Sequence, residues 1–345
     1  MLIFTRLKFL SMYQSKITGL GFYVPDNIIT NEDLSKIIDT DDNWIQERTG
    51  IKERRHVVRG EDTTTSMGVK AANIAIERSG VAADEIDFII FATISPDYYF
   101  PGPGVSLQKE LGLKTIGALD IRNQCSGFIY ALSVADQFIK TGMYKTILVV
   151  ASELQSLGLD MTTRGRAVSV IFGDGAGAAI LTRSDDDSGI LSTHLHSEGE
   201  YAKELALLAP GMGGRWVTDI LYENDPNDVS YFPYMNGQLV FKNAVARFSE
   251  VIAEGLEANN LRVEDIDLLI PHQANLRISQ FIQKKFELSD DQVFNNIQKY
   301  GNTTAASIPI ALTEAWELGK IKKGDTVVLA AFGSGFTWAS AIIKW

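Results

Sequence analysis

Residues 80–93 read GVAADEIDFIIFAT, and residues 260–273 read NLRVEDIDLLIPHQ. In each stretch a polar segment leads through Ile-Asp into a short apolar run, which is typical of a helix end followed by a buried strand. A second pair of segments also resemble each other: FGDGAGAAIL, which starts at Phe172, and FGSGFTWASAII, which starts at Phe332. Both begin with a glycine-rich turn and continue as an apolar strand. The recurrence of these segments in the same order indicates a chain made of two similar halves.

From residue 17 onward, short apolar runs alternate with amphipathic segments, which is typical of layered α/β architecture. We place the boundary between the halves at the acidic stretch of residues 183–188. The first half then spans residues 13–184 and the second spans residues 185–345. The expected strands are residues 86–92, 146–151, 178–181, 266–270 and 326–331, and the expected helices are residues 65–79, 128–141, 237–258 and 305–318.

The composition limits the partners that the protein can have. The 345 residues include 32 Lys and Arg against 43 Asp and Glu, so no overall basic field attracts nucleic acid or an anionic membrane. No stretch is long and apolar enough to cross a bilayer, and residues 1–10 lack the features of a signal peptide. We interpret them as an extension, with Met12 as an alternative start. Because the single cysteine excludes intramolecular disulfides, we expect a soluble cytoplasmic protein.

The cysteine lies at the start of an expected helix. Residues 120–142 read DIRNQCSGFIYALSVADQFIKTG, in which apolar residues from Phe128 to Ile139 form one stripe. Cys125 therefore lies at or just before the N-terminus of a buried helix, where unpaired N–H groups and the helix dipole favour a thiolate. A thiolate can attack thioesters. The alternative interpretation is that Cys125 is a small buried apolar residue.

Further motifs place polar groups beside expected strands. His272 directly follows the strand at residues 266–270, and loops at the carboxyl ends of strands form the ligand crevice of α/β sheets. Asn302 belongs to a Gly-Asn turn, and residues 332–337 form a glycine-rich loop whose N–H groups can face an oxyanion. Taken alone, each motif has a structural alternative, namely a histidine at a strand end, a turn-forming asparagine and an ordinary glycine loop.

Taken together and in this order, NQCSGF, GDGAGAA, PHQAN, YGNTTAAS and FGSGFTW resemble the β-ketoacyl-acyl carrier protein synthase III family of thiolase-like condensing enzymes. The similarity runs from about residue 17 to residue 345 and includes TDDNWIQERTGIKERR near the start. It implies a thiolase-like five-layered αβαβα fold built from two duplicated halves, and a homodimer. It also implies catalytic roles for Cys125 in the first half and for His272 and Asn302 in the second.

The resemblance implies a reaction in two stages. Cys125 would accept an acyl group from acyl-CoA, and His272 and Asn302 would then stabilise the enolate formed when malonyl-acyl carrier protein loses carbon dioxide. The backbone N–H groups of Cys125 and Ser334 would hold the acyl oxyanion, and neither a metal nor another cofactor would be needed. The product would be β-ketoacyl-acyl carrier protein, which initiates fatty acid synthesis.

The resemblance also implies binding roles outside the catalytic set. Trp44 and Arg48 resemble the pair that encloses the adenine of coenzyme A, with Arg164 as its third partner. Asn275 resembles a residue that contacts the pantetheine arm, and Phe100 would close the acyl pocket of the partner subunit. Each of these has a structural alternative as a packed aromatic or a solvated polar group. The remaining candidates are Phe332 for the substrate and, for docking of the acidic carrier protein, Lys242, Arg277, Lys284 and Lys285.

Two segments depart from the family pattern. Residues 122–124 read RNQ where small apolar residues are usual, so the preference for an acyl starter cannot be inferred from the family. Residues 211–228 form a longer stretch, which is either a lid over the acyl tunnel or an inert insertion. Two other functions stay open. One is a related condensing enzyme of secondary metabolism that starts a polyketide or makes a quinolone, and the other is a non-catalytic acyl-binding scaffold.

Overall fold

The computed structural model describes residues 13–345 except 185, 214, 217–218, 220–224 and 226–227. The expected extension at residues 1–10 and the alternative start at Met12 lie outside the described residues, as does much of the stretch 211–228. Within the described part of the chain, none of the helices is long and apolar enough to span a bilayer.

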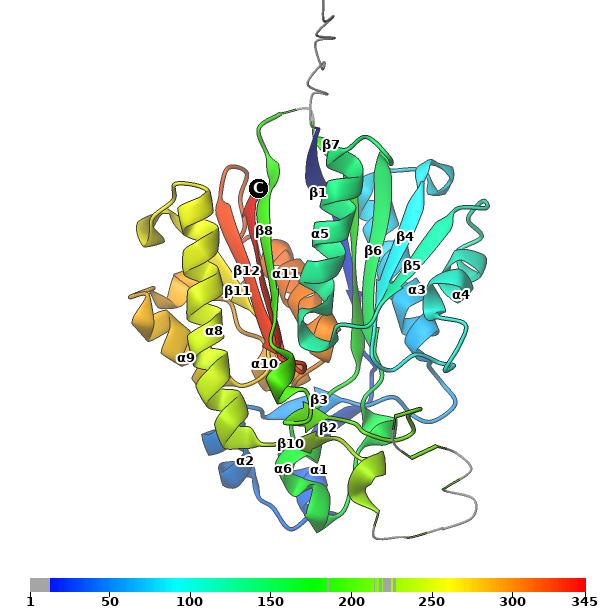
Figure 1. Cartoon of the computed structure of the whole chain (residues 1–345), viewed down its shortest axis with the longest axis vertical. Helices are drawn as coiled ribbons and strands as arrows, with labels where there is room; N and C mark the ends of the chain where they lie inside the picture. The colour runs from blue at the N-terminus through cyan, green and yellow to red at the C-terminus, as the bar shows by residue number, and fades with distance from the viewer. Residues whose placement is uncertain (1–12, 185, 214, 217–218, 220–224, 226–227) are drawn as a thin grey trace, which may run out of the picture.

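Two main sheets lie side by side in the molecule (Figure 1). The first has the strand order β1-β7-β6-β4-β5, and the second has the order β11-β12-β13-β8. The strands of the first sheet are β1 (Gln14–Tyr23), β4 (Phe88–Ala92), β5 (Gly117–Ile121), β6 (Thr146–Glu153) and β7 (Gly175–Ser184). Those of the second sheet are β8 (Gly189–Ser197), β11 (Leu268–Pro271), β12 (Thr326–Gly333) and β13 (Thr337–Lys344).

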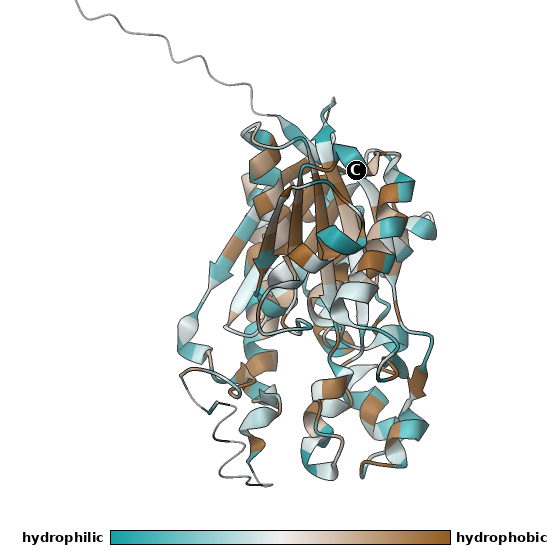
Figure 2. Cartoon of the chain, turned by 90° about the vertical axis from the view of Figure 1, so that its right-hand side faces the viewer, coloured by the Kyte–Doolittle hydropathy of each residue, from teal (hydrophilic) through white to brown (hydrophobic). Residues whose placement is uncertain are grey.

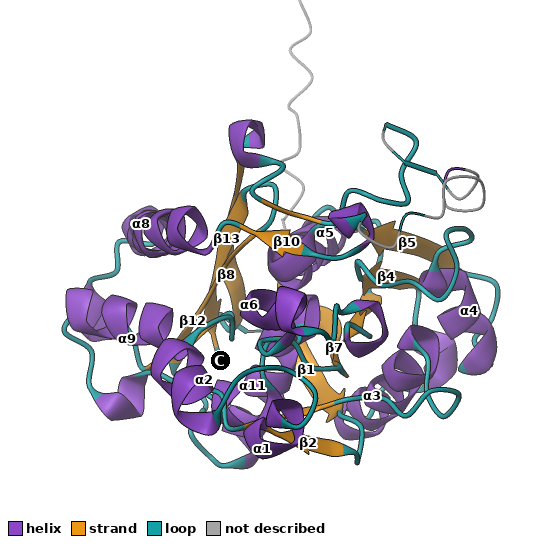
Figure 3. Ribbon diagram, turned by 90° about the horizontal axis from the view of Figure 1, so that it is seen from below, coloured by secondary structure: helices purple, strands orange, loops and turns teal. Residues whose placement is uncertain are grey.

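Helices cover the outer faces of both sheets and fill the space between them (Figures 1 and 3). α3 and α4 lie outside the first sheet, α8 and α9 lie outside the second, and α5 and α11 lie between the two. The layers therefore follow the order helix, sheet, helix, sheet, helix, so the predicted five-layered αβαβα fold is confirmed. The helices are α3 (Thr64–Ser79), α4 (Pro103–Glu110), α5 (Gly127–Lys140), α8 (Gly237–Ala258), α9 (Leu276–Lys285) and α11 (Ser307–Glu317).

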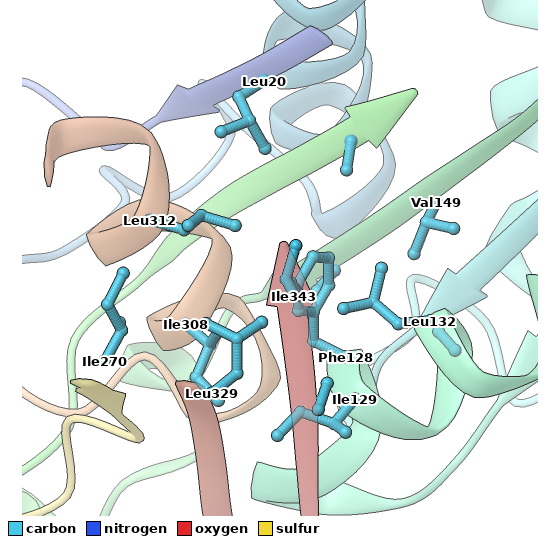
Figure 4. Close-up of a cluster of buried hydrophobic side chains, with 14 of the residues drawn as sticks. Leu20, Phe128, Ile129, Leu132, Val149, Ile270, Ile308, Leu312, Leu329 and Ile343 are labelled. Atoms are coloured by element: carbon cyan, nitrogen blue, oxygen red, sulfur yellow. The ribbon is translucent and has the colours of Figure 1, made fainter. Parts of the chain in front are cut away.

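Apolar clusters hold these layers together. The central cluster lies between the sheets and includes Phe128 and Leu132 of α5 and Leu312 of α11 (Figure 4). Every residue of β6 and β12 is buried, which explains why both strands read as almost continuous apolar runs. Figure 2 shows the same pattern, with brown strands inside and more polar segments toward the surface.

The two halves have the same internal construction. β4 is parallel to β6 as β11 is to β12, and β7 and β13 then pair antiparallel to β6 and β12. The repeated Ile-Asp motif also has the same role. The Asp87 carboxylate accepts the N–H of Thr146 at 3.3 Å, and that of Asp267 accepts the N–H of Thr326 at 2.7 Å. The duplication is therefore confirmed, while the residue limits of the two halves stay a prediction.

A smaller region lies below both sheets in Figure 1 and closes the lower ends of the inner helices. It contains segments from both halves of the chain, which places residues far apart in sequence beside one another. Its elements are α1 (Asn31–Ser35), α2 (Asp42–Thr49), α6 (Arg166–Ser169), α10 (Ile297–Tyr300), β2 (Ile28–Thr30), β3 (Glu53–Arg55), β9 (Leu205–Ala206) and β10 (Tyr234–Met235).

Candidate active site

Cys125 lies in a single 3₁₀ turn, Gln124–Ser126, that leads directly into α5. Its side chain is buried, and Gln124 has a φ of 43°, which a residue other than glycine rarely adopts. The turn packs against the end of β12, where a Cβ on Gly333 would lie 2.6 Å from the Cβ of Cys125. Position 333 therefore requires glycine, because any side chain there would displace the candidate nucleophile.

The surroundings of Cys125 keep its sulfur protonated in the free protein. Burial raises the pKa of the Cys125 thiol to about 12, and the charge of Glu153 adds to this effect. The backbone N–H groups of Cys125 and Ser334 lower the pKa, because both donate toward the sulfur. The expectation that the helix start yields a resting thiolate is therefore not met. Both amides thus lie next to the sulfur, and their role as an oxyanion hole stays a prediction.

His272 follows β11, and its backbone N–H donates to the carbonyl of Ala330 in β12 at 2.8 Å. Its Nδ1 lies 2.6 Å from the Oγ of Ser307, the first residue of α11. That Oγ also accepts the N–H of Gln273 at 3.4 Å, so we assign the hydroxyl proton to Nδ1 of His272 and the imidazole proton to Nε2. Nε2 is buried without a partner among the described residues. Burial lowers the pKa of His272 to about 3, so the ring is a neutral donor at pH 7.

Asn302 is fixed by its backbone and by one end of its side chain. Its N–H donates to the carbonyl of Ile171 at 2.9 Å, and its carbonyl accepts the N–H of Gly173 at 3.1 Å. Its Oδ1 accepts the N–H of Thr304 at 2.8 Å, which leaves Nδ2 as the group that can donate to a ligand. Thr304 begins the 3₁₀ turn Thr304–Ala306, which leads into α11.

The structure brings the three predicted catalytic residues into one region. The turn that holds Cys125 contacts the turn that directly follows Asn302 and Thr303. His272 is bonded to Ser307, where α11 begins. This region lies at the lower ends of α5 and α11 in Figure 1, where β4, β6, β11 and β12 end. The turn that carries the thiol thus contacts the turn between Asn302 and Ser307, the residue to which His272 is bonded.

Trp44 in α2 is flanked by two guanidinium groups. Cζ of Arg48 lies 4.5 Å from the ring centre of Trp44, and Cζ of Arg166 lies 4.8 Å from it. Arg164, expected as the third partner, instead pairs with Asp160 through Nε and Oδ2 at 2.6 Å. The second guanidinium at Trp44 is thus that of Arg166, at the start of α6, while the role of Arg164 in binding coenzyme A stays a prediction. Trp44 and Arg48 also line a surface hollow of about 540 Å³.

Asn275, the expected pantetheine contact, has both ends of its side chain bonded to the protein. Its Oδ1 accepts the N–H of Arg277 at 2.9 Å and so caps α9. Its Nδ2 donates to the carbonyl of Arg48 at 2.8 Å. The side chain therefore joins α9 to α2, and its role in binding a substrate stays a prediction.

Phe332, the remaining substrate candidate, lies in the apolar core, and its role in binding a substrate stays a prediction. Its side chain is 3% exposed and packs on Phe336, with the ring centres 4.9 Å apart. Both belong to the cluster between the second sheet and α8. Side chains alternate along a strand, so Phe332 points to the face of β12 opposite to the one on which Gly333 meets Cys125.

The other candidates lie at the surface. Phe100 is 81% exposed, and its ring contacts that of Tyr99, which in turn contacts Trp216. Arg122, in the segment that departs from the family pattern, is also exposed. The four basic candidates for carrier docking are exposed on two adjacent helices, α8 and α9 (Figure 3).

Sequence reasoning missed Arg166, Ser307 and Glu153. Ser307 stands in the quoted motif YGNTTAAS, but its bond to His272 depends on how two distant segments pack. Arg166 is two positions from the residue that was chosen. Glu153 carried one usable signal, because a carboxylate ends the apolar run TILVVASE at residues 146–153.

Known proteins share both this sequence and this fold. The chain matches the family models of 3-oxoacyl-[acyl-carrier-protein] synthase III over residues 119–199 and of its C-terminal part over residues 256–345. It is 45% identical to β-ketoacyl-[acyl-carrier-protein] synthase III of Xanthomonas campestris pv. campestris, with 96% of this chain and 98% of the relative covered.

Solved structures agree with this match. The 3-oxoacyl-[acyl-carrier-protein] synthase III from Aquifex aeolicus has a TM-score of 0.87 and 42% identity, with 96% and 100% of the two chains covered. The priming β-ketosynthase of the R1128 polyketide pathway has a TM-score of 0.86 and 32% identity, with 96% and 97% covered. The resemblance seen in the motifs is thus confirmed over nearly the whole chain, which belongs to the β-ketoacyl-acyl carrier protein synthase III family and is a condensing acyltransferase.

Proposed function

We propose that this chain transfers an acyl group from acyl-CoA to Cys125 and then condenses it with malonyl-acyl carrier protein. The products are carbon dioxide and β-ketoacyl-acyl carrier protein, the first intermediate of fatty acid synthesis. One observation supports this reaction above the others: the turn that holds the buried thiol contacts the turn that follows Asn302. In the same region, Nε2 of His272 has no partner among the described residues, and the amide nitrogen of Asn302 remains available because its oxygen is bonded to Thr304. A simple thioesterase that used Cys125 and His272 would not require Asn302.

The first stage is an exchange between a thiol and a thioester. The sulfur of Cys125 attacks the acyl carbonyl, the bond from that carbon to the sulfur of coenzyme A breaks, and one thiol replaces another. Because the pKa of Cys125 lies well above 7, its proton leaves during the attack and is returned to the departing coenzyme A. The N–H groups of Cys125 and Ser334 stabilise the oxyanion that forms between these two events.

The second stage forms the carbon–carbon bond. The malonyl group loses carbon dioxide, and the charge that develops on its thioester oxygen is stabilised by Nε2–H of His272 and Nδ2–H of Asn302. Both donors are neutral, so they stabilise the enolate without protonating its carbon. That carbon attacks the acyl group on Cys125, whose sulfur leaves and regains a proton. The donors are protein side chains, so the proposed chemistry requires no metal ion.

The surface supports the remaining parts of the proposal. Exposed Lys242 on α8, with Arg277, Lys284 and Lys285 on α9, offers cations to an acidic carrier protein. The exposed ring of Phe100 and the unpaired edge of β5 offer an apolar contact to a second copy of the chain. A single cysteine that works as a reduced thiol suits the cytoplasm.

A second function is a condensing enzyme that starts a polyketide, which the similarity to the priming β-ketosynthase supports. The higher identity to β-ketoacyl-[acyl-carrier-protein] synthase III favours fatty acid initiation.

Intact-mass spectrometry tests the first stage of the reaction. Incubation of the folded protein with acyl-CoA of increasing chain length, without a malonyl partner, should add one acyl mass. Cys125→Ala should add none, because no other cysteine is present. If the folded wild type acquires no acyl mass across the whole series, the proposed function is wrong. If the wild type does acquire an acyl mass, the addition of malonyl-acyl carrier protein should yield the β-ketoacyl product rather than a free acid.

A further inference from the structure

The duplicated halves contain two equivalent turns, each in front of an inner helix. Gln124–Ser126 precedes α5 in the first half, and Thr304–Ala306 precedes α11 in the second. The first residue of each turn has the same unusual backbone, with a φ of 43° at Gln124 and 50° at Thr304. Cys125 in the first turn therefore corresponds to Ala305 in the second.

The strand ends that face these turns correspond as well. β6 and β12 are each eight residues long and start at the equivalent residues Thr146 and Thr326, so Glu153 and Gly333 both occupy the last position. Gly333 packs against Cys125 and supplies no side-chain oxygen to the amides there, which donate toward the sulfur. At the second turn the protein supplies the oxygen itself, because Oε1 of Glu153 accepts the N–H of Ala305 at 3.4 Å.

Glu153 joins this second turn to the first sheet. Its side chain is fully buried, and in the loop after β4 its Oε2 accepts the hydroxyl of Ser95 at 2.8 Å, the hydroxyl of Thr93 at 3.2 Å and the N–H of Ile94 at 3.2 Å. Oε2 also accepts Nε2–H of Gln155 at 3.1 Å. One carboxylate thus ties the loop after β4 to the turn that follows Asn302.

The turn to which Glu153 is bonded contacts the turn that holds Cys125, so the charge of Glu153 also acts on the candidate nucleophile. It raises the pKa of Cys125 in addition to the effect of burial. Burial raises the pKa of Glu153 itself to about 7, although the hydrogen bonds from Ser95 and Ile94 lower this pKa. The carboxyl therefore gains or loses its charge near neutral pH.

The other elements around Glu153 contribute few ionisable groups. Residues 93–95 and 304–306 supply hydroxyls and backbone amides. Asp174, just before β7, has its carboxylate bonded to the N–H groups of Val57 and Gln155 and to Ser156. On the far side of the second turn, His272 is bonded to Ser307 and is neutral.

We infer that Glu153 is a positioning residue that fills the second copy of the anion-binding turn. Its carboxylate holds the turn after Asn302 in place, and its negative charge opposes formation of the Cys125 thiolate. The inference rests on the proposed function where it concerns condensation, but the effect on the thiol is a property of the free protein. The negative charge of Glu153 keeps the free thiol protonated, and a protonated thiol reacts slowly with unwanted electrophiles.

Alkylation of Cys125 by iodoacetamide, followed by intact-mass spectrometry, tests the effect on the thiol. Glu153→Gln keeps the shape of the side chain and removes its charge, so at about pH 8 the variant should react several-fold to tenfold faster than the wild type. Below about pH 6 the wild-type carboxyl is protonated, and the two rates should converge. A merely structural role would not produce this pH dependence. Two results would overturn the inference: equal alkylation rates of Glu153→Gln and the wild type at about pH 8, or the same ratio of these rates at about pH 8 and below about pH 6.

Asp174→Asn is the matched control, because it removes a second fully buried carboxylate whose bonds do not reach either turn. It should leave the alkylation profile of Cys125 unchanged, and the same acceleration in this variant would refute a specific effect of Glu153.

If Glu153→Gln does not fold, Ser95→Ala serves instead. Loss of the 2.8 Å hydrogen bond should raise the pKa of Glu153 further, so alkylation at about pH 7.5 should become faster than in the wild type. An unchanged rate would contradict the inference.

Condensation provides the second measurement. In Glu153→Gln the turn after Asn302 loses its charged acceptor, so condensation should fall relative to acyl transfer. A variant that condenses at the wild-type rate would show that Glu153 does not position this turn. Since alkylation needs neither acyl-CoA nor the carrier protein, its result stands even if the proposed function fails.

Discussion

His272 and Asn302 each have one polar group bonded to the protein and one for which the described residues show no partner. Nδ1 of His272 is bonded to Ser307, and Oδ1 of Asn302 is bonded to Thr304, so both side chains are fixed in orientation. A buried N–H without a partner costs about 1–3 kcal/mol. An enolate oxygen that accepts from both groups removes this cost at the moment when charge develops, which is the condition for stabilising a transition state.

Substitution of these donors should separate the two stages of the reaction. Asn302→Ala should still accept an acyl group on Cys125 and should lose condensation by a factor on the order of a hundred or more. His272→Ala should slow both stages, because an imidazole near the sulfur would also favour the thiolate. Cys125→Ala should fail to hold an acyl group while still releasing carbon dioxide slowly from malonyl-acyl carrier protein.

Acyl transfer and release of labelled carbon dioxide should be measured separately for the three variants. Condensation by Asn302→Ala at the wild-type rate would contradict the assigned roles. So would a loss of decarboxylation confined to Cys125→Ala.

At the scale of elements, the site depends on where the 3₁₀ turn at Gln124–Ser126 meets the end of β12. The side chain of Ser126 is bonded to Thr337 through their hydroxyls at 2.7 Å, which links this turn to the start of β13. Gly333 allows the approach because it has no Cβ. Two elements from different halves therefore determine the position of a single sulfur atom.

Gly333→Ala should displace the nucleophile. The added Cβ would lie 2.6 Å from Cβ and 3.0 Å from Sγ of Cys125, so either the turn or the strand end must move. A misplacement of about 1 Å can cost about a hundredfold in rate, and we expect a loss of acyl transfer of that order. Gly158→Ala is the control, since its Cβ would meet no atom within 4 Å. Equal acylation rates in the two variants, measured by intact mass, would be incompatible with this packing.

For the whole molecule, the first sheet ends at β5, whose outer edge has no strand partner in the part of the chain that the structure describes. β5 is the last strand of its order, and its Leu119 is 37% exposed. The aromatic residues Tyr98, Tyr99 and Phe100 are exposed between β4 and α4. Unpaired edges and exposed aromatic surfaces favour association, and a two-fold axis would bring two such edges together.

We therefore expect the protein to sediment as a dimer. Leu119→Lys should shift it toward monomer, because two like charges would meet across the axis. Leu318→Lys changes an equally apolar residue that is 61% exposed at the end of α11, away from β5, and should leave the dimer intact. A fully active wild-type monomer in sedimentation velocity would rule out the proposed role of Phe100.

The layered fold could be predicted from the sequence because its central strands are buried on both faces and read as apolar runs. Each expected strand and helix is present, with ends that differ by a few residues. β1, β5 and β8 were not predicted, since their partly exposed side chains leave no such run, and neither were α4 and α9. The three catalytic candidates were found through their motifs. Arg166, the orientation of Phe332 and the contacts of Glu153 depend on packing between distant segments, which one sequence does not reveal.

The pairing of Glu153 with Ala305, and of Gly333 with Cys125, constrains how the duplicated gene could evolve. In a chimaera of two first halves, each cysteine would face a glutamate, and its amide would already be bonded to a carboxylate. In a chimaera of two second halves, both turns would face a glycine, but neither would carry a nucleophile. A turn that binds a substrate oxygen beside a thiol therefore needs the cysteine of one half and the glycine of the other, so the halves of the present chain are not interchangeable.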